Sequence, residues 1–84
     1  MAVTAKFKVG RLTPWVGEIV DGKIVGENAT GEVELVPDYA GGRNTDWAQA
    51  TPSGVIRLSI TNTAALEYFE VGAPYTVTLE RDDS

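Results

Sequence analysis

Residues 19–25 read IVDGKIV, with an Ile-Val pair on each side of a central Asp-Gly and a lysine. Asp21-Gly22 is a strong signal for a type I′ turn, the two-residue turn whose twist matches that of two antiparallel strands. This turn pairs Val20 with Lys23, and it also pairs Ile19 with Ile24 and Glu18 with Val25. The stretch therefore predicts a β-hairpin over about residues 15–27.

Both faces of this hairpin carry large aliphatic side chains. Ile19 and Ile24 share one face, while Val20 and Val25 share the other face with charged residues. A hairpin that is apolar on both faces either lies inside the fold or contacts a partner. We interpret it as an inserted arm that leaves the main sheet, with a core hairpin as the alternative. The partner-binding residues of such an arm are Trp15, Ile19, Val20, Ile24 and Val25.

Four other segments alternate apolar and polar residues, as half-buried strands do. They are residues 3–9, 32–36, 55–60 and 75–79. If the first two of these strands are neighbours, Lys6 and Lys8 can face Glu32 and Glu34 across the sheet. With the hairpin, these segments predict a mainly β fold, a small sheet or barrel of about five or six strands. The expected inward-facing residues are Val3, Ala5, Phe7, Val9, Val33, Leu35, Ile56, Leu58, Ile60, Tyr75, Val77 and Leu79.

One segment, near residues 63–70, has helical spacing instead. Asn62 or Thr63 can cap a helix by accepting hydrogen bonds from its free amides, and apolar residues follow at helical intervals. Gly72 suits the left-handed residue that ends a helix, and Pro74 prevents its continuation. The sequence predicts a helix of about two turns that packs on the sheet.

The composition describes one small domain that lacks the side chains most used in catalysis. The chain has 84 residues, a size for a single domain, and residues 81–84 are expected to form a frayed tail. It contains no histidine and no cysteine, the commonest general bases, nucleophiles and zinc ligands. The acidic residues Asp38 and Asp46 are interpreted as surface carboxylates. We therefore expect no enzyme activity, no metal site and no cofactor.

The charge of the chain bears on its partners and location. The formal net charge is −5, and the seven basic residues are scattered along the sequence. Binding to nucleic acid depends on a concentrated basic surface, so this composition does not favour it. No apolar run is long enough for a signal peptide or a membrane span. We expect a protein that is not secreted by a signal peptide and that does not contact a membrane.

A long loop covers about residues 37–54 and is the second candidate site. Long ordered loops in small domains are often functional. Its candidate recognition residues for a ligand or a partner are Tyr39, Arg43, Asn44 and Trp47, because aromatic residues and arginine carry much of the energy of interfaces. Arg43 beside Gly41-Gly42 can also bind an anion. The structural alternative is that Trp47 caps the open end of the sheet.

The order of several motifs resembles that of small accessory proteins encoded by tailed bacteriophages. The motifs are AKFKV at 5–9, VELVPDY at 33–39, N..WA.ATPSG at 44–54 and N..A...FE.G..Y.V.L at 62–79. The resemblance covers most of the chain except the hairpin, which looks like an insertion. It implies a viral accessory protein, located in the virion or in the host cytoplasm.

Two functions fit this resemblance. In the first, the chain is a virion component that decorates or cements the capsid, and its partners are capsid protein or further copies of itself. In the second, it is an oligomeric anti-defence protein that sequesters a nucleotide-like signal or blocks a host immune enzyme, with the hairpin at the subunit contact. A site for several phosphates needs focused basic charge, whereas only Arg43 lies in the long loop. This difference favours the virion component.

Overall fold

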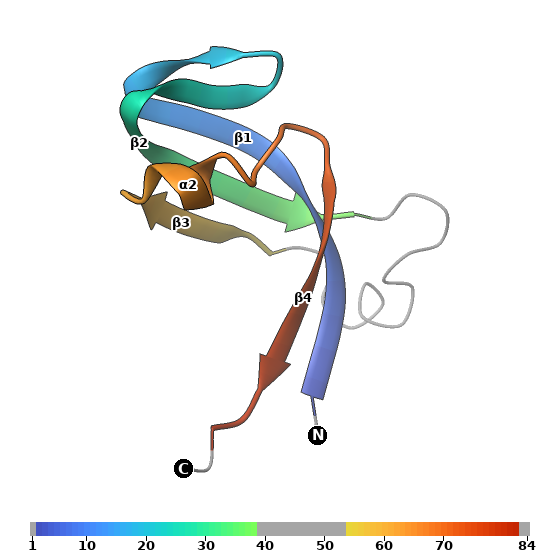
Figure 1. Ribbon diagram of the computed structural model, residues 1–84. Helices are drawn as coiled ribbons and strands as arrows, with labels where there is room; N and C mark the ends of the chain where they lie inside the picture. The colour runs from blue at the N-terminus through green and yellow to red at the C-terminus, as the bar shows by residue number, and fades with distance from the viewer. Residues whose placement is uncertain (1, 39–53, 83–84) are drawn as a thin grey trace.

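The computed structural model describes residues 2–38 and 54–82, which form four strands and one short helix (Figure 1). All neighbouring strands are antiparallel, in the order β3-β2-β1-β4. The elements are β1 (Ala2–Val20), β2 (Lys23–Pro37), β3 (Ile56–Ile60), α2 (Thr63–Leu66) and β4 (Pro74–Glu80). The predicted mainly β class is confirmed.

The strand count is lower than predicted because the hairpin is not an insertion between separate strands. The predicted strand 3–9 and the first strand of the hairpin are one continuous strand of 19 residues, β1. The second strand of the hairpin likewise continues into the predicted strand 32–36 as β2. The described residues therefore form one open sheet of four strands and not a barrel of five or six.

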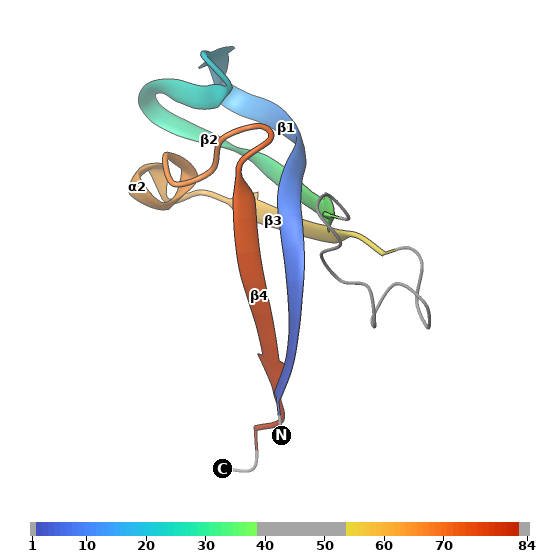
Figure 2. The same cartoon turned by 90° about the vertical axis from the view of Figure 1, so that its right-hand side faces the viewer.

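Strand β1 changes its neighbouring strand along its length. Residues Ala2–Lys8 of β1 pair with β4, whereas pairing with β2 begins at Phe7. The first part of β1 and β4 consequently form a two-stranded ribbon that extends away from the other strands (Figures 1 and 2). The pairing of β1 with β2 contains three register shifts, between Val9 and Arg11 and on both sides of Val16. Such irregularities bend and twist a strand pair, and the hairpin end curls over the sheet accordingly (Figure 2).

The core lies between one face of this sheet, the curled hairpin and the segment that contains α2. Its buried residues include the predicted Ala5, Phe7, Val9, Val33 and Leu35, and α2 contributes Leu66. Ile56, Ile60, Phe69, Tyr75 and Val77 pack against it and are partly buried. Leu79 was also expected to point inward, but 65% of its surface is exposed. It lies on the two-stranded ribbon, beyond the part of the sheet that the described core covers.

The helix begins where the sequence predicts and ends earlier. The side chain of Asn62 accepts a hydrogen bond from the Ala65 amide at 3.1 Å, which caps α2. After Leu66 the chain continues in tighter turns, in which the Tyr68 amide bonds to the Ala65 carbonyl and the Phe69 amide to the Leu66 carbonyl. Gly72 has a φ of +84°, the left-handed conformation predicted for it.

The predicted pairing of Lys6 and Lys8 with Glu32 and Glu34 is wrong. The tight turn sets the register at the hairpin tip and three register shifts change it along the strand pair, so Lys8 lies opposite Val36, and Glu34 lies opposite Arg11. Arg57 of β3 donates from Nε to the Glu34 carboxylate at 2.9 Å. The Lys6 ammonium donates instead to the Thr76 hydroxyl of β4 at 2.8 Å.

Gly31 offers a test of how closely the curled hairpin approaches the sheet. A Cβ at this buried position would lie 2.6 Å from the Thr13 carbonyl oxygen and 2.7 Å from Ile24 Cδ1. We expect Gly31→Ala to lower the free energy of unfolding in urea by about 2–3 kcal/mol through overpacking. Gly72→Ala is the control, because a Cβ there has no atom within 4 Å and only the left-handed backbone costs about 1–2 kcal/mol. A loss below about 1 kcal/mol for Gly31→Ala would contradict the close approach.

Candidate interaction surfaces

The hairpin forms as predicted. Asp21 and Gly22 have φ values of +51° and +79°, as the central residues of a type I′ turn require. Val20 pairs with Lys23, Ile19 with Ile24 and Glu18 with Val25. The short Asp-Gly signal therefore gave the correct turn and the correct register at the tip.

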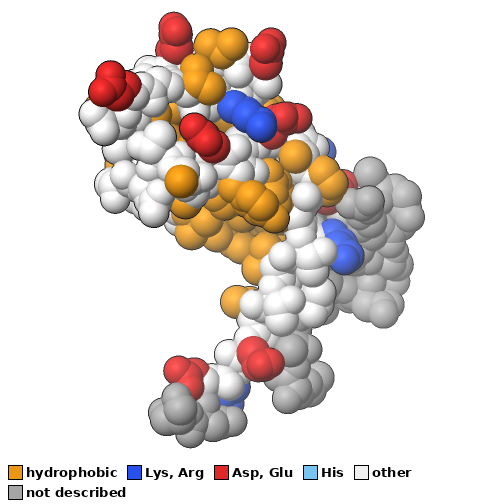
Figure 3. All heavy atoms as spheres, in the orientation of Figure 1, with side chains coloured by type: hydrophobic (Ala, Val, Ile, Leu, Met, Phe, Trp, Pro, Cys, Tyr) orange, Lys and Arg blue, Asp and Glu red, His pale blue; other side chains and the backbone are white. Residues whose placement is uncertain are grey.

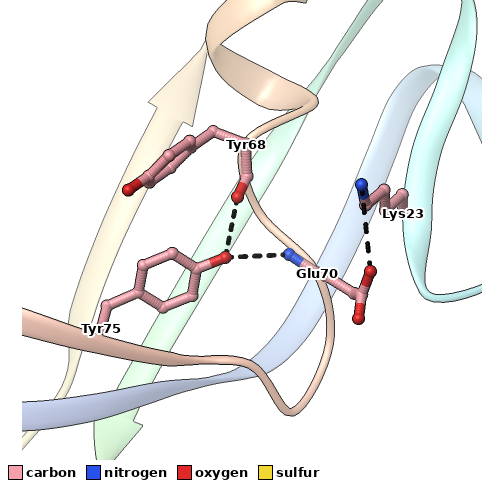
Figure 4. Close-up of polar contacts among 4 residues, drawn as sticks. All are labelled: Lys23, Tyr68, Glu70 and Tyr75. Carbon is pink, nitrogen blue, oxygen red and sulfur yellow. Dashed lines mark hydrogen bonds and ion pairs between the residues drawn. The ribbon is translucent and has the colours of Figure 1, made fainter.

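The tip of the hairpin is attached to the segment between α2 and β4. The Val71 amide donates to the Gly22 carbonyl at 2.8 Å. The Lys23 ammonium lies 3.9 Å from the Glu70 carboxylate (Figure 4). Ile24 is fully buried in the core, whereas Ile19 beside it remains half exposed. The hairpin is thus neither a free arm nor a fully enclosed core element. Of the predicted partner-binding residues, Ile24 is unavailable to a partner, and Val25 is partly buried.

The other predicted residues of the hairpin are accessible. Trp15, Ile19 and Val20 are between 44% and 52% exposed, as is the neighbouring Val16. Exposed acidic residues interrupt them, namely Glu18, Asp21 and Glu27. Figure 3 shows hydrophobic side chains at the hairpin end with acidic side chains beside them. We call Trp15, Val16, Ile19 and Val20 the hairpin surface; Ile19 and Val20 lie on opposite faces of the hairpin, so this surface is apolar on both faces and has an acidic border.

The two isoleucines of the tip separate the structural role from the surface role. Ile24→Ala should lower the free energy of unfolding by about 2–5 kcal/mol, because it leaves a cavity in the core. Ile19→Ala should change it by less than about 1 kcal/mol, since the side chain is half exposed. Urea denaturation of both variants checks the difference. A large loss for Ile19→Ala would show that this side chain belongs to the core.

A second surface, which sequence reasoning missed, is an aromatic cluster formed by Tyr68, Phe69 and Tyr75. The ring centroids lie 5.4–5.6 Å apart. The Tyr75 hydroxyl donates to the Tyr68 carbonyl at 2.8 Å and accepts from the Glu70 amide at 3.3 Å (Figure 4). Tyr68 remains 71% exposed. The available signal was the pair of tyrosines seven residues apart on both sides of the Gly72–Pro74 turn.

The aromatic cluster borders an apolar face of the sheet. Leu58 of β3 lies opposite the buried Val33 and is therefore on the core face, yet it is 37% exposed. Figure 3 shows hydrophobic side chains gathered over β2 and β3, between α2 and β4. α2 is only one turn long and covers part of this face.

The two hydrogen bonds of the Tyr75 hydroxyl can be tested by removing its oxygen atom. Tyr75→Phe should lower the free energy of unfolding by about 0.5–1.5 kcal/mol, because the Tyr68 carbonyl and the Glu70 amide lose their side-chain partner. Tyr68→Phe is the matched control, because the Tyr68 ring is exposed and its hydroxyl has no hydrogen-bond partner among the described residues. Chemical denaturation of both proteins gives the comparison. An unchanged midpoint for Tyr75→Phe would mean that water replaces this bond without loss.

The described residues give little support for a small-ligand site. A surface hollow of about 290 Å³ is lined by Lys6, Pro74, Tyr75 and Thr76, and Lys6 carries the charge among them. Within 2–38 and 54–82, no group of three or more carboxylates is placed to hold a metal ion. None of the helices in these ranges is long and apolar enough to cross a membrane. The candidate loop residues Tyr39, Arg43, Asn44 and Trp47 lie outside the described residues.

Comparison of the chain with protein-family models, with curated proteins and with solved structures gave no match.

Proposed function

We propose that this chain is a non-enzymatic accessory protein of a tailed phage and acts as a virion component that decorates the capsid. The phage setting comes from the motif resemblance at 5–9, 33–39, 44–54 and 62–79. The observation that carries the proposed role is the hairpin surface, where apolar side chains remain accessible on the strand that leads into a two-residue turn. Exposed apolar groups rimmed by polar ones mark protein-interaction sites.

The hairpin surface also specifies the chemistry of its partner. Trp15, Ile19 and Val20 supply aromatic and aliphatic groups of the kind that anchor interfaces, with Ile19 and Val20 on opposite faces of the hairpin. Glu18, Asp21 and Glu27 place negative charge at its border. The complementary surface on the capsid protein is therefore apolar, with lysine or arginine at its edge.

The alternative function is an oligomeric anti-defence protein that sequesters a nucleotide-like signal or blocks an immune enzyme. Sequestering such a signal requires several cationic groups that converge on a pocket. In the described part of the chain, Arg57 is paired with Glu34, and Lys23 with Glu70. No contact there favours this alternative over the virion component.

The proposed function is tested with purified phage particles that lack the protein. Wild-type protein should bind these particles and co-sediment with them, and Ile19→Asp should weaken binding by about tenfold or more, since a charge replaces an interface anchor. Ala64→Asp, at an exposed position of α2, is the matched control and should bind as the wild type does. Equal urea midpoints of the three proteins ensure that folding is not the cause.

Two results would contradict the virion role. One is absence of the protein from purified wild-type particles together with no binding of the added protein. The other is a native mass spectrum in which the protein carries an additional mass of nucleotide size, which would support the anti-defence alternative.

A further inference from the structure

Between its terminal Pro74 and Glu80, the outer edge of β4 lacks the devices by which edge strands avoid association. Natural edges are short, charged, bulged or interrupted by proline. Residues 75–79 of β4 read YTVTL, without charge or proline, and β4 pairs with β1 over seven residues without a register shift. Among the described strands, none pairs with the other side of β4.

The opposite edge of the sheet is different. β3 has five residues and carries Arg57 at its second position, with the guanidinium bound to Glu34. A shorter edge with a charged side chain is better protected. Of the two sheet edges, β4 is therefore the one at which another strand can more readily pair.

The backbone hydrogen bonds of β1 fix which backbone groups of β4 point outward. The Lys6 carbonyl accepts from the Asp38 amide, on the β2 side of β1. In an antiparallel pair the direction alternates, so Ala5 and Phe7 direct their backbone groups toward their β4 partners, Val77 and Tyr75. Their β4 neighbours, Thr76, Thr78 and Glu80, therefore direct their N–H and C=O groups away from the sheet.

We propose that two copies of the chain pair antiparallel through these edges, about a two-fold axis at Thr78. Thr78 then lies opposite Thr78 of the second copy, and Thr76 opposite its Glu80, so that every outward N–H and C=O of these residues is paired. An axis one residue earlier, at Val77, places Pro74 opposite Glu80, and proline has no N–H to donate. The resulting contact is isologous and joins two two-stranded ribbons into one sheet of four strands.

The side chains fit the same register. On the apolar face, Val77 lies opposite Leu79 of the second copy, which covers a leucine that is 65% exposed in one chain. On the polar face, Glu80 of the second copy lies beside Thr76. The Lys6 ammonium donates to the Thr76 hydroxyl at 2.8 Å, so it lies on the same face. Lys6 and Glu80 thus bring opposite charges together across the contact, twice in each dimer.

This inference is independent of the proposed function, because the β4 edge and the hairpin surface lie at opposite ends of β1 (Figure 1). The chain contains no cysteine, so single cysteines can report the register without background. In a hydrogen-bonded antiparallel pair the Cα atoms are about 5.5 Å apart, and the Cβ atoms are too far apart for an unstrained disulfide but within reach of a short bifunctional thiol reagent. We expect such a reagent to crosslink Thr78→Cys into a covalent dimer.

Two control variants make the crosslinking specific. Ser59→Cys is exposed on β3, the other edge, and Thr76→Cys is exposed on the same strand away from the axis. Both should crosslink at least about tenfold more slowly than Thr78→Cys, because neither lies opposite itself in the proposed dimer. Equal rates in the three variants would indicate random collision and overturn the proposal, and faster crosslinking of Thr76→Cys would overturn the axis at Thr78.

The charged pair gives a test without cysteine. Sedimentation of the wild-type chain over a wide concentration range should show a monomer–dimer equilibrium. Lys6→Glu and Glu80→Lys should each raise the dimer Kd by roughly tenfold, and the double variant should restore it, because the charges are exchanged and remain complementary. A wild type that stays monomeric at every concentration would overturn the proposal, as would a double variant weaker than both single variants.

Discussion

The structure depends on the contact between Ile24 and the backbone at Gly31. Ile24 comes from the tip of the hairpin, yet it is fully buried, because the long β1–β2 pair curls back and sets this side chain on the sheet. A methyl group at Gly31 would occupy the space of Ile24 Cδ1, so this approach requires glycine. Gly17, with a φ of +104°, meets the same requirement on β1, where a Cβ would lie 2.5 Å from the Val25 carbonyl oxygen. An 84-residue chain has few residues for a core, and this folding-back lets the hairpin contribute to it.

Local signals in the sequence predicted local structure well. The Asp21-Gly22 turn, the Asn62 cap, the left-handed Gly72 and the alternation of β1 and β2 each depend on neighbouring residues, and the structure has all of them. The pairing of Lys6 and Lys8 with the glutamates failed because the register set by the turn was not applied along the whole strand pair. Carried from Val20–Lys23 toward the N-terminus, that register places Glu34 opposite Val9, and the register shifts along the pair move it to Arg11; neither position is a lysine.

The candidate surfaces were harder to predict, because their exposure depends on how distant elements pack. Ile19 and Ile24 have the same character and face each other across the hairpin, yet only the bend of the strands makes one of them core and the other surface. The aromatic cluster is formed when the Gly72–Pro74 turn brings Tyr75 back against Tyr68, a contact that helical spacing alone does not indicate. Period and composition specify which face of an element is apolar, but they do not specify how much of that face a one-turn helix can cover.

The positions of the two proposed contacts have a consequence for the virion role. The hairpin surface lies at one end of β1, and the ribbon that carries the β4 edge lies at the other (Figure 1). In the proposed dimer, a two-fold axis at Thr78 would place the two hairpins at its far ends, where the proposed virion role has them bind two separate capsid subunits. Once one hairpin has bound, the second binds at the high effective concentration that the rigid sheet imposes, so weak individual contacts add up to tight attachment. A small chain with a modest apolar surface can in this way hold neighbouring subunits together, which is the property that a capsid-decorating protein requires.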